Sequence, residues 1–206
     1  MTENRQRLER VVADPVAREW FAGLFRRAHV AVGDTGERFT VLHHGERAEV
    51  LDGFEGDEPN FVLAVTSEML EALQAIFADG TVDAAEELRI VRRMLRPCLE
   101  AALAMPVLNN DALRAILRLD AHWQESLVGP DGEEYEPLTA IHTGDGWTVE
   151  EGFVGTPQRR LRITPRQALE FQRRLFRADE EGSLASWIDL ARWYTAFRRD
   201  ATVPVA

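Results

Sequence analysis

FTVLHHGERAEVLDGFEG, residues 39–56, recurs in diverged form 99 residues later as LTAIHTGDGWTVEEGFVG, residues 138–155. Seven of these 18 aligned positions are identical, whereas random pairing at ordinary composition gives about one identity. The similarity continues downstream, where AVTSEMLEALQ (64–74) aligns with RITPRQALEFQ (162–172) after removal of one residue. Self-similarity at a nearly fixed offset indicates a tandem duplication.

This duplication predicts the domain organisation. We assign residues 1–15 to an N-terminal helical extension, 16–108 to repeat one and 109–206 to repeat two, with Met105 to Asn110 as the linker.

Each repeat reads as a helix, four strands and a further helix. In repeat one, turn residues and alternating apolar residues predict strands near 28–33, 37–43, 47–51 and 60–66, and repeat two follows the same pattern. Thr164-Pro165-Arg166-Gln167 has the form of a capping box, with proline at the first helical position. Further helices are expected over 84–103, with a kink at Pro97, and over 183–199.

Short antiparallel strands bracketed by helices predict an α+β fold, in which helices cover one face of a four-stranded sheet. Doubling this unit gives either one wide pseudo-twofold sheet covered by helices or two abutting domains. The pattern does not choose between them.

Composition narrows the classes of function. The 206 residues are 45% hydrophobic and 29% charged, which is typical of a globular protein. No apolar run is long enough to span a membrane, and the first residues are charged, so we expect a cytoplasmic protein without membrane insertion.

All 24 basic residues are arginine, which excludes lysine Schiff-base chemistry. A net charge of -11 opposes binding to phosphate backbones, so no nucleic-acid partner is expected. Cys98 is the only cysteine and is interpreted as a small buried apolar residue.

Residues 37–80 and 138–176 resemble the sterol carrier protein type two family. Members have a leading helix, antiparallel strands with a glycine after the third, and a fourth strand that leads into an amphipathic helix. The resemblance implies a carrier for an acyl lipid, sterol or isoprenoid-like molecule. Family members usually follow that helix with a short strand, whereas 83–103 and 183–197 read here as helices. The matching segments are His44-Gly45-Glu46, Val50 to Gly53, Pro59 to Leu63, Thr66 to Leu70, Gly146-Trp147, Val149 to Gly152 and Leu161 to Leu169.

Aromatic residues are concentrated in repeat two, which makes it the better candidate for an apolar pocket. Large rings fill ordinary cores equally well, so this pattern alone does not establish a ligand. The candidate ligand-binding residues are Trp123, Trp147, Phe171, Leu175, Trp187 and Tyr194 in repeat two, with Phe61 and Leu73 in repeat one.

Four histidines occupy what read as matched positions, His29 and His43 in one repeat and His122 and His142 in the other. If the first hairpin of each repeat turns at its central glycine, each pair lies cross-strand, within reach of one zinc or iron ion. A register error of one residue would place the partners on opposite faces of the sheet. Structural histidines inherited through duplication are the favoured interpretation.

Seven arginines between 159 and 177 suggest either an anion site or a solvated face that pairs with nearby acids. No serine or cysteine has the sequence context of a nucleophile with its base, so no catalytic residue and no cofactor is assigned. The leading hypothesis is a non-enzymatic carrier of an apolar small molecule. The alternatives are a protein-interaction or homo-oligomerisation module with a fully packed core, and a metal-dependent protein that uses a histidine pair.

Overall fold

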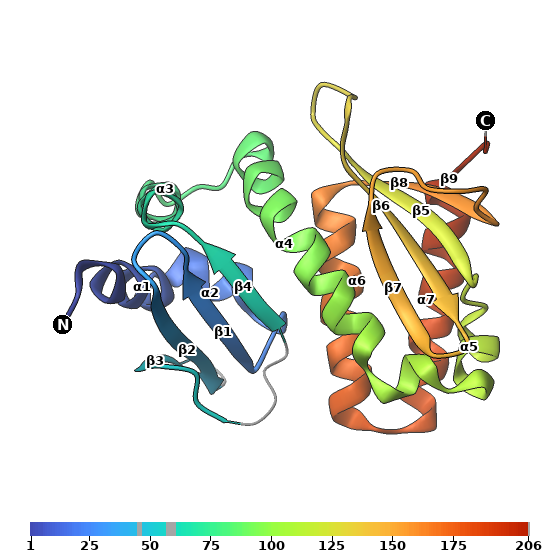
Figure 1. Cartoon of the computed structure of the whole chain (residues 1–206), viewed down its shortest axis with the longest axis horizontal. Coiled ribbons are helices and arrows are strands. Elements are labelled where there is room, and N and C mark those ends of the chain that lie inside the picture. Colours follow the sequence, from blue (N-terminus) through green and yellow to red (C-terminus); the bar gives the residue numbers. More distant parts are fainter. Residues whose placement is uncertain (45–46, 57–60, 206) are drawn as a thin grey trace. The chain divides into compact units, whose positions relative to one another are not determined.

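The computed structural model describes residues 1–44, 47–56 and 61–205. Gly45, Glu46 and the stretch Asp57 to Asn60, which carry part of the family resemblance, lie outside the described residues, as does the side chain of Phe61. The chain folds into two compact units, Met1–Glu86 and Glu87–Ala206 (Figure 1).

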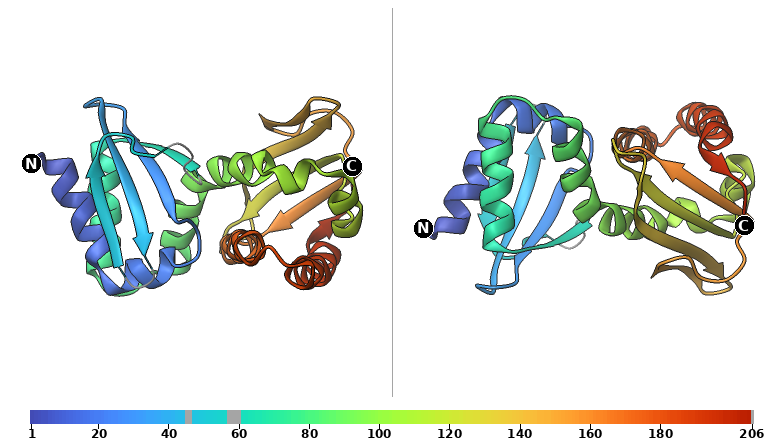
Figure 2. Two further views of the ribbon diagram at one scale, coloured as in Figure 1. Left: turned by 90° about the horizontal axis from the view of Figure 1, so that it is seen from below. Right: turned by 90° about the horizontal axis from the view of Figure 1, so that it is seen from above.

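The first unit contains a four-stranded sheet in the order β3-β2-β1-β4. Its helix α3 packs against α1 beside the sheet (Figure 2). The elements are α1 (Glu3–Ala13), α2 (Pro15–Phe21), β1 (Arg27–Val32), β2 (Glu37–His44), β3 (Arg47–Asp52), β4 (Phe61–Val65) and α3 (Ser67–Ala78).

The second unit repeats this topology and adds a fifth strand, in the order β7-β6-β5-β8-β9. Its elements are α4 (Ala84–Ala104), which starts in the last residues of the first unit, η1 (Pro106–Asn109), α5 (Asp111–Leu117), β5 (His122–Val128), β6 (Glu134–Thr143), β7 (Gly146–Glu151), β8 (Arg159–Ile163), α6 (Pro165–Glu181), α7 (Leu184–Ala201) and β9 (Thr202–Val203).

The α+β class is confirmed. Of the two arrangements that the sequence left open, the strands form two separate sheets, one in each unit. The predicted antiparallel pairing is wrong for the fourth strand, because β4 pairs with β1 in parallel and β8 pairs with β5 in parallel. The fourth strand crosses to the far edge of the hairpin instead of continuing beside the third, and only such a crossover allows a parallel pair.

The duplication survives in matched hydrogen bonds. The Thr40 hydroxyl donates to the carbonyl of Gly53 at 2.9 Å, and the Thr139 hydroxyl donates to that of Gly152 at 2.6 Å. Both glycines have a φ of 82°, a left-handed conformation that glycine adopts without a steric penalty. These repeated glycines therefore end the third strand in the same way in both units.

Helix α1 corresponds to the second half of α4, so the boundary between the repeats lies before α4 and not after it. Arg5 pairs with Glu9 in its own helix and with Asp52 at the end of β3. Arg96 likewise pairs with Glu100 in its own helix and with Glu151 at the end of β7. The predicted N-terminal extension is thus the first helix of unit one, and α4, which we assigned to the end of repeat one, opens unit two. Helix α4 runs without a break through Pro97.

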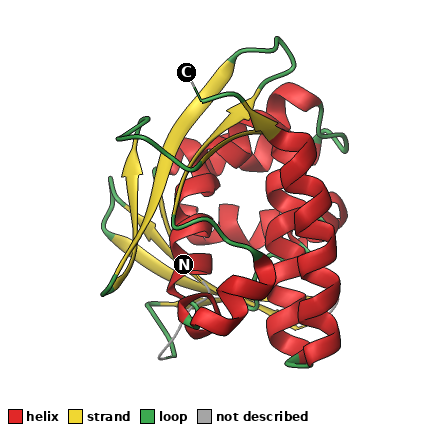
Figure 3. Cartoon of the chain, turned by 90° about the vertical axis from the view of Figure 1, so that its right-hand side faces the viewer, coloured by secondary structure: helices red, strands yellow, loops and turns green. Residues whose placement is uncertain are grey.

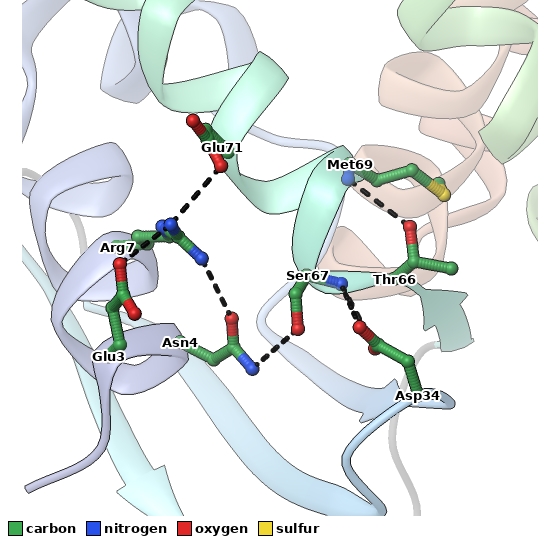
Figure 4. Close-up of polar contacts among 8 residues, drawn as sticks. All are labelled: Glu3, Asn4, Arg7, Asp34, Thr66, Ser67, Met69 and Glu71. Atoms are coloured by element: carbon green, nitrogen blue, oxygen red, sulfur yellow. Dashed lines mark hydrogen bonds and ion pairs between the residues drawn. The ribbon is translucent and has the colours of Figure 1, made fainter.

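Buried Asn4 fastens α1 to the rest of the first unit (Figure 4). Its side-chain amide donates to Ser67 Oγ at 2.9 Å and to Glu37 Oε2 at 2.6 Å. The Ser67 backbone N–H donates to Asp34, and bonding with Ser67 lowers the pKa of that carboxyl. This network joins α1, the β1–β2 turn and the start of α3, so its role is structural.

In the second unit the helices lie on one side of the sheet (Figure 3). Helix α6 starts at the predicted capping box, where Gln167 N–H donates to Thr164 Oγ1 and the Gln167 side chain accepts from Thr164 N–H. Gly182 then ends α6 in a left-handed conformation. The capping box is confirmed, and it fixes the residue at which α6 begins.

Candidate ligand cavity in the second unit

An apolar cavity of about 60 Å³ lies in the second unit between the sheet and the helices α4, α6 and α7. Strands β5 and β8 supply its floor through Trp123, Glu125, Leu161 and Ile163. Sites for drug-sized ligands usually enclose about 300–1,000 Å³. A lipid-sized ligand therefore requires the helices to move apart.

Four of the aromatic and apolar residues that we predicted to bind a ligand meet at this cavity: Trp123, Phe171, Leu175 and Tyr194. Trp147, Trp187 and Leu73 do not line it, and the side chain of Phe61 lies outside the described residues. Trp147 donates its indole N–H to the Leu108 carbonyl at 3.1 Å and packs edge-on against Trp123. Trp187 is a buried core residue, and Leu73 belongs to the first unit.

Glu125 is a buried carboxyl on the cavity floor that sequence reasoning missed. Its side chain is flanked on the sheet by Leu138 and Leu161, its partners in β6 and β8. Trp123 Nε1–H donates to Glu125 Oε2 at 3.0 Å. Burial raises the pKa of this carboxyl and outweighs the opposite effect of the Trp123 hydrogen bond. Glu125 therefore favours the neutral form and can donate a hydrogen bond.

Gln172 on α6 is the second polar group of the cavity. Only 4% of the residue is exposed, and among the described residues its Nε2 has no hydrogen-bond partner. An unsatisfied buried donor costs about 1–3 kcal/mol. Such a group in a cavity is a reason to look for a ligand that accepts its hydrogen bond.

An aromatic cluster between α6 and α7 borders the cavity. Phe171 and Phe197 line the cavity but are only half-buried, and their rings stack at 6.5 Å with an interplanar angle of 15°. Trp193 stacks on Phe197 at 5.1 Å, and the Arg174 guanidinium lies over the Trp193 ring. Because these rings are partly in solvent, this seam is the natural place for the cavity to open.

Sequence signals for the missed residues existed. Trp123, Glu125 and Leu127 alternate along β5, which places a carboxyl on the same face as two large apolar residues. Gln172 lies within the buried stripe of α6, between Leu169 and Leu175. Polar residues on a core-facing side are informative because they require partners.

Cys98 lines the cavity from α4 and is half-buried rather than fully buried as the sequence suggested, so its reactivity measures how far the folded chain shields the thiol. Burial raises the pKa of its thiol to about 12. Because the thiolate is the reactive form, we expect reaction with a disulfide reagent near pH 8 to be slower than in denaturant by about two to three orders of magnitude. The rate should be followed by release of the coloured thiolate from the reagent. Equal rates in folded and unfolded chains would show that the folded chain does not shield the thiol.

The predicted histidine pairs do not form metal sites. His29 pairs with Thr40 across the sheet, and the N–H of His43 bonds to Arg26, so the two side chains point to opposite faces. In the second unit His122 pairs with Ile141, which again leaves His142 on the other face. Among the described residues, no three His, Cys, Asp or Glu side chains are grouped closely enough to hold a metal ion.

The register also corrects the matching of the histidines. His29 faces Thr40, and Gln124 faces the equivalent Thr139, so Gln124 rather than His122 corresponds to His29. His29 stacks on Phe54 at 4.4 Å, and its Nε2 lies 3.2 Å from the Glu55 carbonyl, which is a structural arrangement.

Five of the seven arginines between 159 and 177 form ion pairs within the second unit. Arg159 pairs with Asp120, and both Arg160 and Arg162 pair with Glu134. On α6, Arg174 and Arg177 pair with glutamates one turn away, Glu170 and Glu181. These pairings favour the interpretation of a solvated, internally neutralised face over an anion site.

Comparisons with known proteins identified no relative of this chain. No family model matches the chain, and neither a curated protein nor a solved structure is significantly similar to it. No helix in the described part of the chain is both long and apolar enough to cross a bilayer. The fold and the site define a two-unit α+β protein whose second unit encloses an apolar cavity with buried polar groups.

Proposed function

We propose that this protein is a non-enzymatic binding or carrier protein for an apolar small molecule of the acyl, sterol or isoprenoid class, and that the second unit holds the ligand. The observation that carries this proposal is the cavity between the sheet and α4, α6 and α7, whose lining is apolar except for a few buried polar groups. Ligand sites typically combine an apolar lining with a few such groups.

The strand β9 supports the resemblance to the sterol carrier protein type two family. We expected helices in place of the short strand that usually follows the amphipathic helix in that family. In the second unit the chain forms both, because α7 is followed by β9, which pairs antiparallel with β8. The family stays a proposal, carried by this strand, the loose sequence motif and the cavity.

Ligand entry requires α6 and α7 to separate at the aromatic seam. Across this seam, the Phe171 ring of α6 stacks on the rings of Trp193 and Phe197 and contacts the Tyr194 ring at a tilted angle. Non-directional apolar contacts can be exchanged for contacts with an apolar ligand at little net cost. An acyl chain or isoprenoid can therefore take the place of part of this packing.

The proposal is tested on the full chain. Native protein extracted with organic solvent should yield a stoichiometric lipid by mass spectrometry, and the delipidated protein should bind Nile red, a neutral apolar fluorophore. Replacing Ala168, which lines the cavity, with phenylalanine fills the site and should weaken Nile red binding by about tenfold or more.

Ala72→Phe on α3 is the matched control. Ala72 is also half-buried, on the corresponding helix of the first unit, and does not line the cavity. It should leave Nile red binding unchanged. An empty extract combined with no Nile red binding would reject the carrier and favour the interaction module with a packed interior.

A further inference from the structure

We infer that the cavity of the second unit selects apolar ligands with an uncharged carbonyl head group, such as an ester, ketone or aldehyde, and that Gln172 and Glu125 donate hydrogen bonds to its oxygen. This inference rests on the proposed carrier function. It specifies the chemical class of the ligand and the two residues that would recognise it.

Gln172 supplies the first donor. It lies on the inward face of α6, flanked in sequence by buried Leu169 and Leu175, and lines the cavity. Its Nε2 is buried and has no partner among the residues that the structure describes. A ligand oxygen in the cavity would satisfy this donor, whereas a purely apolar ligand would leave it unpaired.

Glu125 supplies the second donor from the opposite wall. One of its oxygens already accepts the Trp123 indole N–H at 3.0 Å. The arginines of neighbouring β8 do not neutralise it, because Arg159 pairs with Asp120 and Arg160 with Glu134. Burial without a cationic partner favours the protonated form of a carboxyl, and that form donates through its O–H.

Two donors that face one cavity define the complementary head group. A carboxylate ligand would place a second acidic group beside Glu125, which is unfavourable in an apolar site. An ammonium ligand would require ionised Glu125 and would leave the Gln172 N–H without an acceptor. A neutral carbonyl oxygen, with two lone pairs, can accept from both donors.

The duplication shows that the carboxyl is not needed to build the unit. Gln124 and His29 occupy equivalent positions opposite Thr139 and Thr40, so the next residues, Glu125 and Val30, also correspond. Val30 is buried in the apolar core of the first unit. The same strand position therefore accepts valine, and Glu125 is a feature that only the second unit carries.

The test compares three competitors with the same alkyl chain for displacement of Nile red from the full protein at neutral pH: dodecanoate, methyl dodecanoate and dodecylamine. The ester is expected to displace Nile red at a concentration about tenfold lower than either charged compound, because both donors then have an acceptor. Three variants then separate recognition from folding.

Gln172→Met and Glu125→Val each remove one donor. In both variants the preference for the ester over the two charged competitors should fall to about twofold or less. Nile red has a ring carbonyl of its own, so each displacement is corrected for the affinity of the same variant for Nile red. Glu125→Gln keeps an N–H donor and should retain the preference for the ester. Thermal unfolding of Gln172→Met serves as the second readout, because removal of an unpaired buried donor should not lower Tm.

The outcomes distinguish this inference from the carrier function. Equal displacement by all three competitors, or strongest displacement by dodecanoate or dodecylamine, would overturn the inference and leave the carrier function intact. Absence of Nile red binding by the wild-type protein would overturn both. A preference for the ester that persists in Gln172→Met and Glu125→Val would show that these residues do not recognise the head group.

Discussion

Glu125→Gln is expected to stabilise the folded chain at neutral pH and to remove a pH dependence of its stability. Burial raises the carboxyl pKa in the folded state above its ordinary value of 4.5. Below that ordinary value, both the folded and the unfolded chain hold the proton. As the pH rises further, the unfolded chain loses the proton first, so the free energy of unfolding falls by up to about 1.4 kcal/mol per pH unit until the folded pKa is reached.

Urea unfolding of wild type and Glu125→Gln between about pH 5 and about pH 8 measures this difference. The titratable groups that share the cavity, Cys98 and Tyr194, stay neutral there, because burial raises both of their pKa values. Parallel stability curves for the two proteins would contradict the prediction and mean that Glu125 is ionised when folded.

Glu134→Gln is the control with the opposite sign. Burial alone would raise the pKa of Glu134, but hydrogen bonds from Ser126 and Arg160 and the charges of Arg160 and Arg162 lower it. A lowered pKa contributes stability above the unfolded pKa, and that stability is lost as the pH falls through the folded pKa. Glu134→Gln should therefore lower stability at neutral pH.

Among the variants proposed here, Leu175→Ala should lower the free energy of unfolding by one of the largest amounts, and it should also enlarge the cavity. Leu175 is fully buried and lines the cavity from α6. Deletion of a buried leucine side chain costs about 2–5 kcal/mol, because the surroundings relax only in part. The space that remains should admit an apolar ligand with less separation of α6 and α7, so Nile red binding to the folded variant should tighten.

Ile76→Ala is the matched control for this prediction. Ile76 is buried in α3 of the first unit and does not line the cavity. It should destabilise the chain by a similar amount, measured by urea unfolding, without change in Nile red binding. Looser binding to Leu175→Ala, or a loss of stability below about 1 kcal/mol, would show that Leu175 does not pack against the ligand space.

The candidate site was only partly predictable from sequence. The concentration of aromatic residues in repeat two indicated the correct unit, and Trp123, Phe171, Leu175 and Tyr194 do line its cavity. The sequence could not distinguish Trp147 and Trp187, which do not line the cavity, from these four residues. The type of ring alone does not show which side of a core a residue faces. The contribution of α4 was missed because this helix had been assigned to the other repeat.

The sequence by itself determined the features that depend on local signals. The duplication is read from identities at a nearly fixed offset along the chain, and the α+β class, the capping box at Thr164 and the helix that follows Ser183 come from caps and periodicities within a few residues of one another. Such signals act through neighbouring backbone groups and side chains. Features that depend on them can therefore be predicted without knowing which distant segments pack together.

Only the tertiary structure decided which distant segments meet. It placed β4 beside β1 and β8 beside β5, and it set the register that separates His29 from His43. It also brought Glu125 of β5 and Gln172 of α6 to one cavity. The physical reason is that strand pairing is non-local and side chains alternate with a period of two, so a shift of one residue exchanges the buried and exposed faces of a strand.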